Sequence, residues 1–464
     1  MRAAGARSGS DDALLATIAY RAAVVVLWSL ALLNGAIARG LFWDGASFLA
    51  NILDFHTFHD FYREREHVAW LTQAPVVLLV KFGLRDSKLL AIVYSVSLFV
   101  WPAILYHAAL SRVRRRPILL AAVVAVLATV YLPTSFFIIG EYNVAYAVAV
   151  AAMAVALTGI RRRRDGVLLC MLGALAIASY EAMVYLGPLI AAAILWSRRQ
   201  AHEEGPIDDL ASLLARLAAL AFLASASVAT VAIVEYWDHA HFSRVRAASL
   251  DFWQNLQFVV PLLGLAVLAL VSFVWPDWLR GKGPVVLLGL VAALLAATPF
   301  LRAIHPQAML FPPSHYVART AAGWLLAAIL LAMWLHVGWR RGRPRVLAKL
   351  EQPEVGRRLA AAFAVVLIAA AVPDLALSRL WVGYLGYFRG LVTNHSGFVR
   401  ANDLPMDEWP HRLFAQSWSY PALSLLLRSG PGQGIVLADT DYRSNQPFVP
   451  SCGTLPRLDG FAWR

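Results

Sequence analysis

Residues 41–75 read LFWDGASFLANILDFHTFHDFYREREHVAWLTQAP and follow the first long apolar run of the chain. The stretch is too polar to continue that run through a bilayer. From Phe48 its apolar residues recur at helical spacing, with charged and amide side chains largely between them. This pattern is typical of a helix in the membrane interface, with aromatic side chains among the headgroups and charges in water. The sequence therefore predicts a first outer loop, residues 40–86, that carries interfacial helices.

The composition indicates a polytopic membrane protein. Of the 464 residues, 60% are hydrophobic and 15% are charged, whereas soluble chains have roughly 45–50% apolar and about 25% charged residues. In a soluble protein the formal net charge of +13 would suggest a nucleic-acid partner. Here the arginines form short clusters between apolar runs, as the positive-inside rule requires, so membrane lipids are expected as partners and nucleic acid is not.

Apolar runs of about 20 residues predict about eleven membrane-spanning helices. The expected spans are 14–38, 87–110, 117–139, 144–160, two helices within 166–196, 211–235, 256–275, 284–300, 320–338 and 359–377. The two helices within 166–196 form a hairpin that turns near Glu181, because a single crossing would leave Arg198 and Arg199 outside. Residues 68–82 are short for a span and contain Pro75, which favours a second interfacial or re-entrant helix.

The arginine clusters also assign an orientation, with the N-terminus cytoplasmic and the C-terminus periplasmic. Residues 1–377 are expected to form the transmembrane bundle, and residues 378–464 a periplasmic region with one short strand at 434–438. The expected fold class is an all-α polytopic membrane protein with a small C-terminal α/β-like region. The preference for arginine over lysine and the abundant alanine suggest a GC-rich bacterium and hence its inner membrane.

Two carboxylates stand at the expected outer ends of neighbouring helices. Asp44 follows the aromatic pair Phe42 and Trp43, and Glu141 follows the span 117–139. Carboxylates at membrane depth are costly unless they have a partner or a task. We therefore expect Asp44 and Glu141 to share one catalytic site. Two structural interpretations stay open: Asp44 as the N-cap of the interfacial helix, and Glu141 as the partner of a nearby arginine.

Other polar residues at expected outer ends are candidates for substrate binding. These are Arg302, His305, His315, Arg319 and Glu181. Arg302 and His305 have an alternative role as headgroup anchors of a helix end, and Glu181 as a structural residue of its turn.

A metal site is a further possibility in the first outer loop. His56 and His59 have the spacing of metal ligands on a helix, although histidines on an interfacial helix are usually only solvated. The candidate ligands for a divalent cation are Asp44, Glu141, His56 and His59.

The arrangement resembles the GT-C glycosyltransferases in several features. An acidic residue after the first helix, Asp44, is followed by amphipathic helices, and a second acidic residue, Glu141, follows the third helix. Basic inner loops and a C-terminal outer region complete the pattern. The family commonly has an acidic pair in its first loop, where this chain has Trp43-Asp44-Gly45.

The resemblance implies an enzyme that moves a sugar from a polyprenyl-phosphate donor to an extracytoplasmic glycolipid or polysaccharide, with inversion at the anomeric carbon. It implies that Asp44 is the general base on the acceptor hydroxyl, or that it helps to hold Mg²⁺ or Mn²⁺. The leaving phosphate needs positive charge from a metal ion or from Arg and His side chains. Arg302, His305, His315 and Arg319 are the expected source.

Two other functions remain open. An O-antigen ligase or polymerase-like enzyme would depend on Arg302 and His305, and Asp44 would be dispensable. A lipid or sugar transporter would bind its substrate near the middle of the membrane, often between repeated halves. No internal repeat is evident in the sequence, and the centres of the expected helices carry few charges.

Overall fold

The computed structural model describes most of the chain. The described residues are 2–59, 63–135, 141–204, 208–235, 256–275, 315–338, 353–406, 411–437 and 460–464, with a few isolated positions between them. Most of the expected span 284–300, and the loop that holds Arg302 and His305, lie outside these residues.

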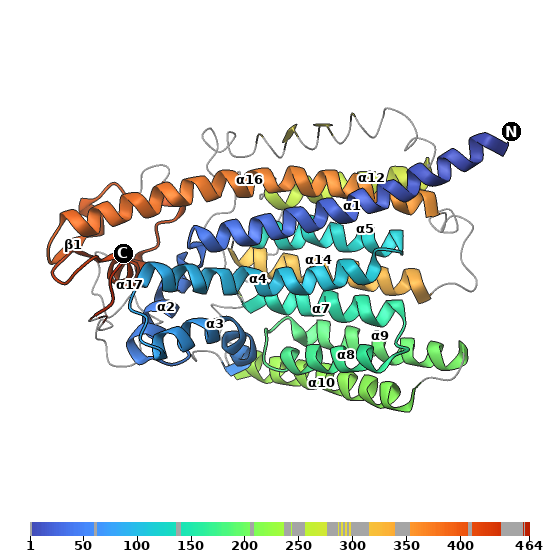
Figure 1. Ribbon diagram of the computed structural model, residues 1–464, viewed down its shortest axis with the longest axis horizontal. Helices are drawn as coiled ribbons and strands as arrows, with labels where there is room; N and C mark the ends of the chain where they lie inside the picture. Colours follow the sequence, from blue (N-terminus) through green and yellow to red (C-terminus); the bar gives the residue numbers. More distant parts are fainter. Residues whose placement is uncertain are drawn as a thin grey trace. The chain divides into compact units, whose positions relative to one another are not determined.

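Helices dominate the described part of the chain (Figure 1). The longer ones are α1 (Arg2–Ala36), α3 (Glu66–Lys81), α4 (Ser87–Val113), α5 (Pro117–Val126), α7 (Glu141–Thr158), α8 (Arg163–Ala176), α9 (Met183–Glu204), α10 (Asp209–Glu235), α12 (Leu256–Val274), α14 (His315–Gly338) and α16 (Pro353–Asn394). A π-helical turn at Leu127–Tyr131 joins α5 to the short α6 (Leu132–Ser135).

Seven helices in the described residues are long and apolar enough to cross a membrane. They are Leu14–Ala36, Ser87–Val113, Pro117–Thr134, Glu141–Thr158, Asp209–Glu235, Ala321–Gly338 and Pro353–Asn394. The chain is therefore a multi-pass membrane protein, as predicted. The total of eleven spans stays a prediction.

The surface of the helices supports this conclusion. On α10 the exposed large apolar side chains are Leu210, Leu213, Leu217, Leu220, Leu223, Val231 and Val234. The opposite face of α10 buries small residues such as Ala211, Ala215 and Ala218. A helix that exposes a long apolar face is suited to lipid rather than to water.

The chain forms two compact units. Unit 1 comprises Met1–Ser29, Pro102–Ser135 and Tyr142–Asp374, and unit 2 comprises Leu30–Trp101, Phe136–Glu141 and Leu375–Arg464.

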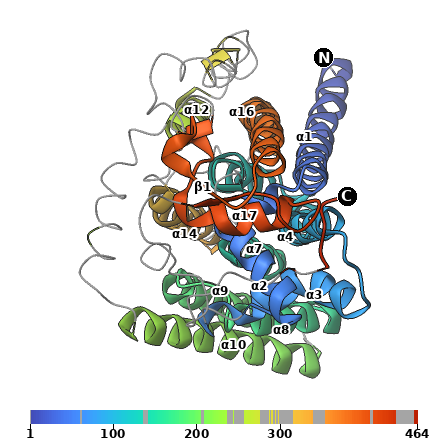
Figure 2. The same cartoon turned by 90° about the vertical axis from the view of Figure 1, so that its left-hand side faces the viewer.

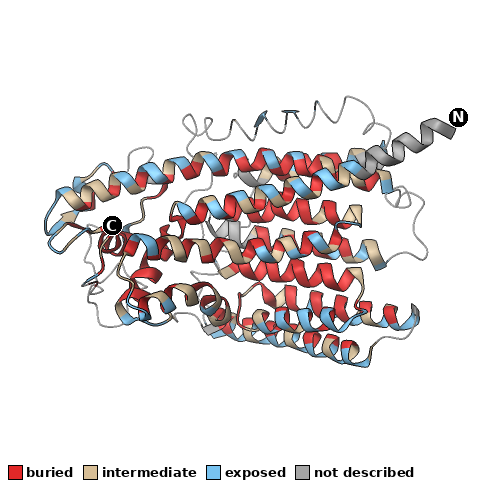
Figure 3. Ribbon diagram, in the orientation of Figure 1, coloured by how far each residue is buried: buried red, intermediate tan, exposed pale blue. Residues whose placement is uncertain are grey.

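Unit 1 is a helical bundle. Helices α5 and α7 are buried along almost their whole length (Figure 3), and α8, α9 and α10 lie side by side. Two glycines of α8 allow α10 to approach closely: a Cβ at Gly166 would lie 2.8 Å from Leu214 Cβ, and one at Gly173 would lie 2.9 Å from Ala221 Cβ. Small residues at such positions are typical of close packing between membrane helices.

Unit 2 includes several short elements. Figure 2 labels α2, α3, α17 and β1 among them, together with the C-terminus of the chain. The helix α2 (Asp44–Phe55) packs against α3 and against α17 (Tyr420–Leu427). Strand β1 (Phe398–Arg400) pairs in parallel with β2 (Ile435–Leu437), with Phe398 opposite Ile435. Backbone bonds also join Ala462 to Arg85 and Ser87, so the segment 460–464 lies along the start of α4.

Several sequence predictions agree with the helix boundaries. Helices α8 and α9 are separated by residues 177–182, where the hairpin was expected to turn. Residues 66–81 form α3, which is not among the candidate spans. The predicted strand at 434–438 is β2.

Two predictions were wrong in their boundaries. The helix that begins in the first loop ends at Phe55, because His56 adopts a left-handed conformation with φ 55°. Nine residues of this helix are buried under its neighbours, so it is a core helix of unit 2 rather than a surface helix. The last long helix does not end at residue 377 but continues to Asn394, since Trp381, Tyr384 and Phe388 are buried on it.

Candidate functional site

Asp44 follows an unusual stretch of backbone. It is the first residue of α2, and the preceding Trp43 has φ 50° and ψ −116°. Residues with a Cβ adopt positive φ rarely, and such strain, on the order of 1–3 kcal/mol, persists where the surroundings enforce it, often at functional sites. Trp43 occupies the N-cap position and makes no side-chain capping bond, so Asp44 is not the N-cap of α2. As an acidic residue in the first turn, it still interacts favourably with the helix dipole.

Aromatic packing enforces this conformation. The buried ring of Trp43 stacks on Phe42 with a centroid distance of 4.6 Å. Phe42 in turn meets Trp381 of α16 and Phe414 edge-on, at centroid distances of 5.8 Å and 6.1 Å. Trp418 contacts Trp43 at 5.8 Å. We call Phe42, Trp43, Trp381, Phe414 and Trp418 the aromatic cluster.

The aromatic cluster also supplies a hydrogen bond to the carboxylate. The indole Nε1–H of Trp418 donates to Asp44 Oδ1 at 3.1 Å. Trp418 lies in a short turn, Ser417–Ser419, just before α17. Both side chains are half-buried. The C-terminal part of the chain therefore holds a carboxylate of the first loop.

Buried polar residues fix the segment before Asp44. Arg39 is 1% exposed, and its Nη1 donates to Asn34 Oδ1 at 2.9 Å and to Ser378 Oγ at 3.2 Å. The backbone N–H of Gly40 donates to Ser95 Oγ at 2.9 Å. The indole of Trp381 donates to the carbonyl of Ile37 at 3.1 Å. These bonds tie the segment to α4 and α16, so the position of Asp44 is preorganised.

Glu141 lies in the same unit as Asp44. It is the first residue of α7, and its Oε2 lies 3.5 Å from Nη1 of Arg65, with both side chains largely buried. The fully buried Tyr94 of α4 interacts electrostatically with both Glu141 and Asp44. Both predicted carboxylates therefore belong to unit 2. The pairing of Glu141 with an arginine, left open by the sequence, is confirmed.

The two histidines of the first loop are not on a helix. His56 Nε2 lies 3.2 Å from Arg85 Nη1. The ring of His59 packs on Phe48 at 4.5 Å, and burial lowers the pKa of His59 to about 4. The helical ligand spacing predicted for this pair is wrong, because α2 ends at Phe55. Among the described residues, no group of three His, Cys, Asp or Glu side chains has the geometry to hold a metal ion.

The other predicted substrate-binding residues are not part of this cluster. Glu181 belongs to unit 1, in the turn between α8 and α9, where it interacts electrostatically with Tyr146 and Tyr185. His315 and Arg319 are in the first turns of α14, also in unit 1. Arg302 and His305 lie outside the described residues.

Sequence reasoning missed two residues of the site, Arg65 and Trp418. Arg65 was one charge among several in the polar loop, and Trp418 was one of 16 tryptophans. The indole and Asp44 are 374 positions apart in the chain. No local pattern in a single sequence reports such a pairing.

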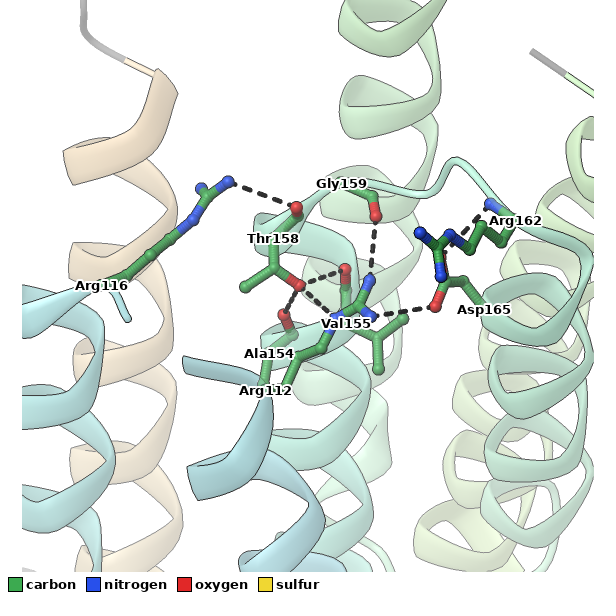
Figure 4. Close-up of polar contacts among 8 residues, drawn as sticks. All are labelled: Arg112, Arg116, Ala154, Val155, Thr158, Gly159, Arg162 and Asp165. Atoms are coloured by element: carbon green, nitrogen blue, oxygen red, sulfur yellow. Dashed lines mark hydrogen bonds and ion pairs between the residues drawn. The ribbon is translucent and has the colours of Figure 1, made fainter. Parts of the chain in front are cut away.

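A second polar cluster, in unit 1, is drawn in Figure 4. Arg112 donates to Thr158 Oγ1 at 2.6 Å and to the Gly159 carbonyl at 3.0 Å, and pairs with Asp165 at 3.0 Å. Arg116 donates to the carbonyls of Leu157 and Thr158. These carbonyls end α7 and have no partner within it, so the arginines act as C-terminal caps. We call these residues the capping cluster.

Comparison of the chain with protein-family models, curated proteins and solved structures gives no match.

Proposed function

We propose that the protein is an inverting glycosyltransferase of a bacterial inner membrane, in which Asp44 is the general base. The donor is a polyprenyl-phosphate sugar and the acceptor is an extracytoplasmic glycolipid or polysaccharide. The observation that carries the proposal is the setting of Asp44. A half-buried carboxylate follows strained backbone at Trp43 and accepts an indole N–H bond from Trp418.

The chemistry fits these side chains. The Asp44 carboxylate takes the proton of an acceptor hydroxyl while the hydroxyl oxygen attacks the anomeric carbon of the donor sugar. The bond from that carbon to the phosphate oxygen breaks, and the polyprenyl phosphate leaves with the bonding electrons. Attack on the face opposite the phosphate inverts the anomeric carbon. The proton then passes from Asp44 to water.

Arg65 is suited to receive the leaving phosphate. A guanidinium matches phosphate oxygens with paired N–H donors, and Glu141 holds Arg65 at 3.5 Å within the same unit as Asp44. In this proposal Glu141 positions Arg65 and does not itself transfer a proton. This differs from the sequence prediction, which assigned the phosphate to Arg302, His305, His315 and Arg319.

A divalent cation, Mg²⁺ or Mn²⁺, was predicted as an alternative charge for the phosphate. Two N–H donors contact these carboxylates, Trp418 at Asp44 and Arg65 at Glu141. These contacts suit anions held by hydrogen bonds better than ligands of a metal ion. The proposed reaction therefore has no metal step.

The proposed test compares envelope glycans by mass spectrometry. A deletion strain of the source bacterium is complemented with wild type, with Asp44→Asn, or with Asp54→Asn. Asp54 is the matched control, because it is a half-buried aspartate on the same helix. The proposal expects the deletion to remove one sugar from a glycan, and expects Asp54→Asn but not Asp44→Asn to restore it at equal protein level.

Two outcomes count against the proposal. Full restoration by Asp44→Asn would leave Asp44 a structural residue and favour a ligase that uses Arg302 and His305. A deletion strain with unchanged glycans and an accumulated lipid or sugar on one side of the membrane would favour a transporter.

A further inference from the structure

The hydrogen bond between Trp418 and Asp44 joins two parts of unit 2 that are distant in sequence. The carboxylate begins α2, and the indole lies in the turn Ser417–Ser419. A carboxylate rotates almost freely about its last side-chain torsion unless a donor fixes it. The indole N–H of Trp418 is such a donor for Asp44.

The turn that carries Trp418 is itself held in place. The N–H and the hydroxyl of Ser419 both donate to the carbonyl of Gln416, at 3.0 Å and 2.9 Å. Helix α17, which follows directly, packs on α2. Its Leu426 carbonyl accepts a hydrogen bond from Ser87 Oγ at 2.8 Å. Both ends of the Trp418–Asp44 bond therefore belong to fixed elements.

Trp381 gives a useful contrast within the same aromatic cluster. Its ring is 1% exposed, and its indole N–H donates to the backbone carbonyl of Ile37. A buried indole needs such a partner, so that bond is explained by packing. Trp418 is only half-buried, so burial demands a partner for its N–H less strictly than at Trp381. Its bond to a carboxylate is therefore not required by burial.

We propose that Trp418 is a positioning residue for Asp44. The indole N–H orients the carboxylate so that a lone pair of Asp44 points at the acceptor hydroxyl, and the C-terminal part of the chain thereby completes the active site. This inference rests on the proposed function, because it gives Trp418 a role in proton transfer to Asp44. Hydrogen bonds to ionised groups are stronger than neutral ones, which suits an orienting role.

The most specific variant removes only the indole N–H of Trp418. Benzothienylalanine at position 418 keeps the two fused rings and has sulfur in place of the indole nitrogen. Trp418→Phe is the genetically simple companion. Trp70→Phe is the matched control, since Trp70 is an exposed tryptophan of α3 in the same unit.

The kinetic test uses purified protein in nanodiscs with a short-chain polyprenyl-phosphate sugar of the class missing in the deletion strain. We expect kcat to fall about 10- to 100-fold in both position-418 variants, since a hydrogen bond to a charged group is worth about that factor. KM and the melting temperature should stay near the wild-type values in the benzothienylalanine protein. Unchanged kcat in that protein overturns the proposal, and so does a raised KM with unchanged kcat, which indicates substrate contact instead.

A second readout needs no substrate. The indole ¹⁵N–¹H resonance of Trp418, assigned by its absence in Trp418→Phe, should shift between wild type and Asp44→Asn, while that of Trp70 should not. Equal Trp418 shifts in the two proteins would show that the hydrogen bond does not form. If Asp44→Asn is fully active, the proposed function fails together with this inference. If Asp44→Asn is inactive and the benzothienylalanine protein is fully active, only the positioning role fails.

Discussion

The site around Asp44 and the capping cluster both place charges at helix ends, but they use them differently. In the capping cluster, Arg112 and Arg116 bond the last carbonyls of α7, and Gly159 ends that helix at a positive φ of 99° suited to glycine. Around Asp44, the positive φ falls on a tryptophan, and the acceptor of the long-range bond is a carboxylate.

The difference separates two explanations for charge in a membrane protein. Arg112 and Arg116 donate to carbonyls at the end of α7, which folding itself leaves without a helical partner. The charges of the capping cluster are thus explained by stability. Folding does not require the Asp44 carboxylate beside the strained backbone of Trp43. A task other than stability therefore explains this carboxylate better.

The largest expected effect on stability is in the capping cluster. Arg112→Leu should lower the free energy of unfolding by roughly 3 kcal/mol, because it leaves the buried Asp165 without its cation. Denaturation in detergent, monitored by circular dichroism, measures the change. The matched control is Arg115→Leu, an exposed neighbour that loses the same charge. Equal stability of the two variants would contradict the capping role.

The next effect concerns acid stability of the first loop. Burial lowers the pKa of His59 to about 4, from 6.5 in the unfolded chain. Below pH 6.5 the unfolded state therefore binds more protons, and stability falls as the pH drops. Between pH 7.5 and pH 5 the loss should be about 2 kcal/mol.

The variant His59→Phe should remove this part of the pH dependence, since a phenyl ring can also pack on Phe48. Melting temperatures of both proteins between pH 5 and pH 7.5 measure it. Parallel pH profiles for the two proteins would show that His59 is not the residue responsible.

A smaller effect tests backbone strain near Asp44. Ala38 has φ 53° and ψ 38°, a left-handed conformation that glycine adopts without penalty. Ala38→Gly should leave stability unchanged or raise it by up to about 1 kcal/mol. The control is Ala31→Gly, at a buried position inside α1, which should lower stability by about 1 kcal/mol. A comparable loss in both variants would argue against strain at Ala38.

The smallest effect is expected at the exposed ion pair of unit 1. Arg163 pairs with Asp208 at 2.7 Å, and this hydrogen bond is the main cause that lowers the pKa of Asp208. The Arg163 side chain is 68% exposed, so solvent screens the pair. Asp208→Asn should leave the melting temperature unchanged. A clear decrease would mean that exposed charges contribute to stability here as the capping cluster does.

Much of the fold could be predicted from the sequence because spans have a strong local signal. Apolar runs such as 87–110 and 211–235 correspond to α4 and α10 within a few residues. The errors arose where tertiary packing overrides local pattern. Helix α16 continues past residue 377 because unit 2 buries its aromatic residues, and α2 stops at Phe55 although apolar residues recur beyond it.

The candidate site could be predicted only in part. Asp44 and Glu141 were found because carboxylates near apolar runs are rare. Their partners Trp418 and Arg65 carry no such signal, since tryptophan and arginine are frequent at helix ends of membrane proteins. The conformation of Trp43 could not be predicted either, because residues with a Cβ rarely adopt positive φ and nothing in the local sequence marks this one.

The most direct test of the central claim measures release of polyprenyl phosphate by purified protein. Wild type and Asp44→Asn, in nanodiscs, are incubated with the polyprenyl-phosphate sugar and with acceptor lipids extracted from the deletion strain. We predict release and sugar transfer by wild type, and a rate at least about 10²-fold lower for Asp44→Asn at equal folded protein, as expected for loss of a general base. Equal rates for the two proteins would contradict the assignment of Asp44 as the catalytic base.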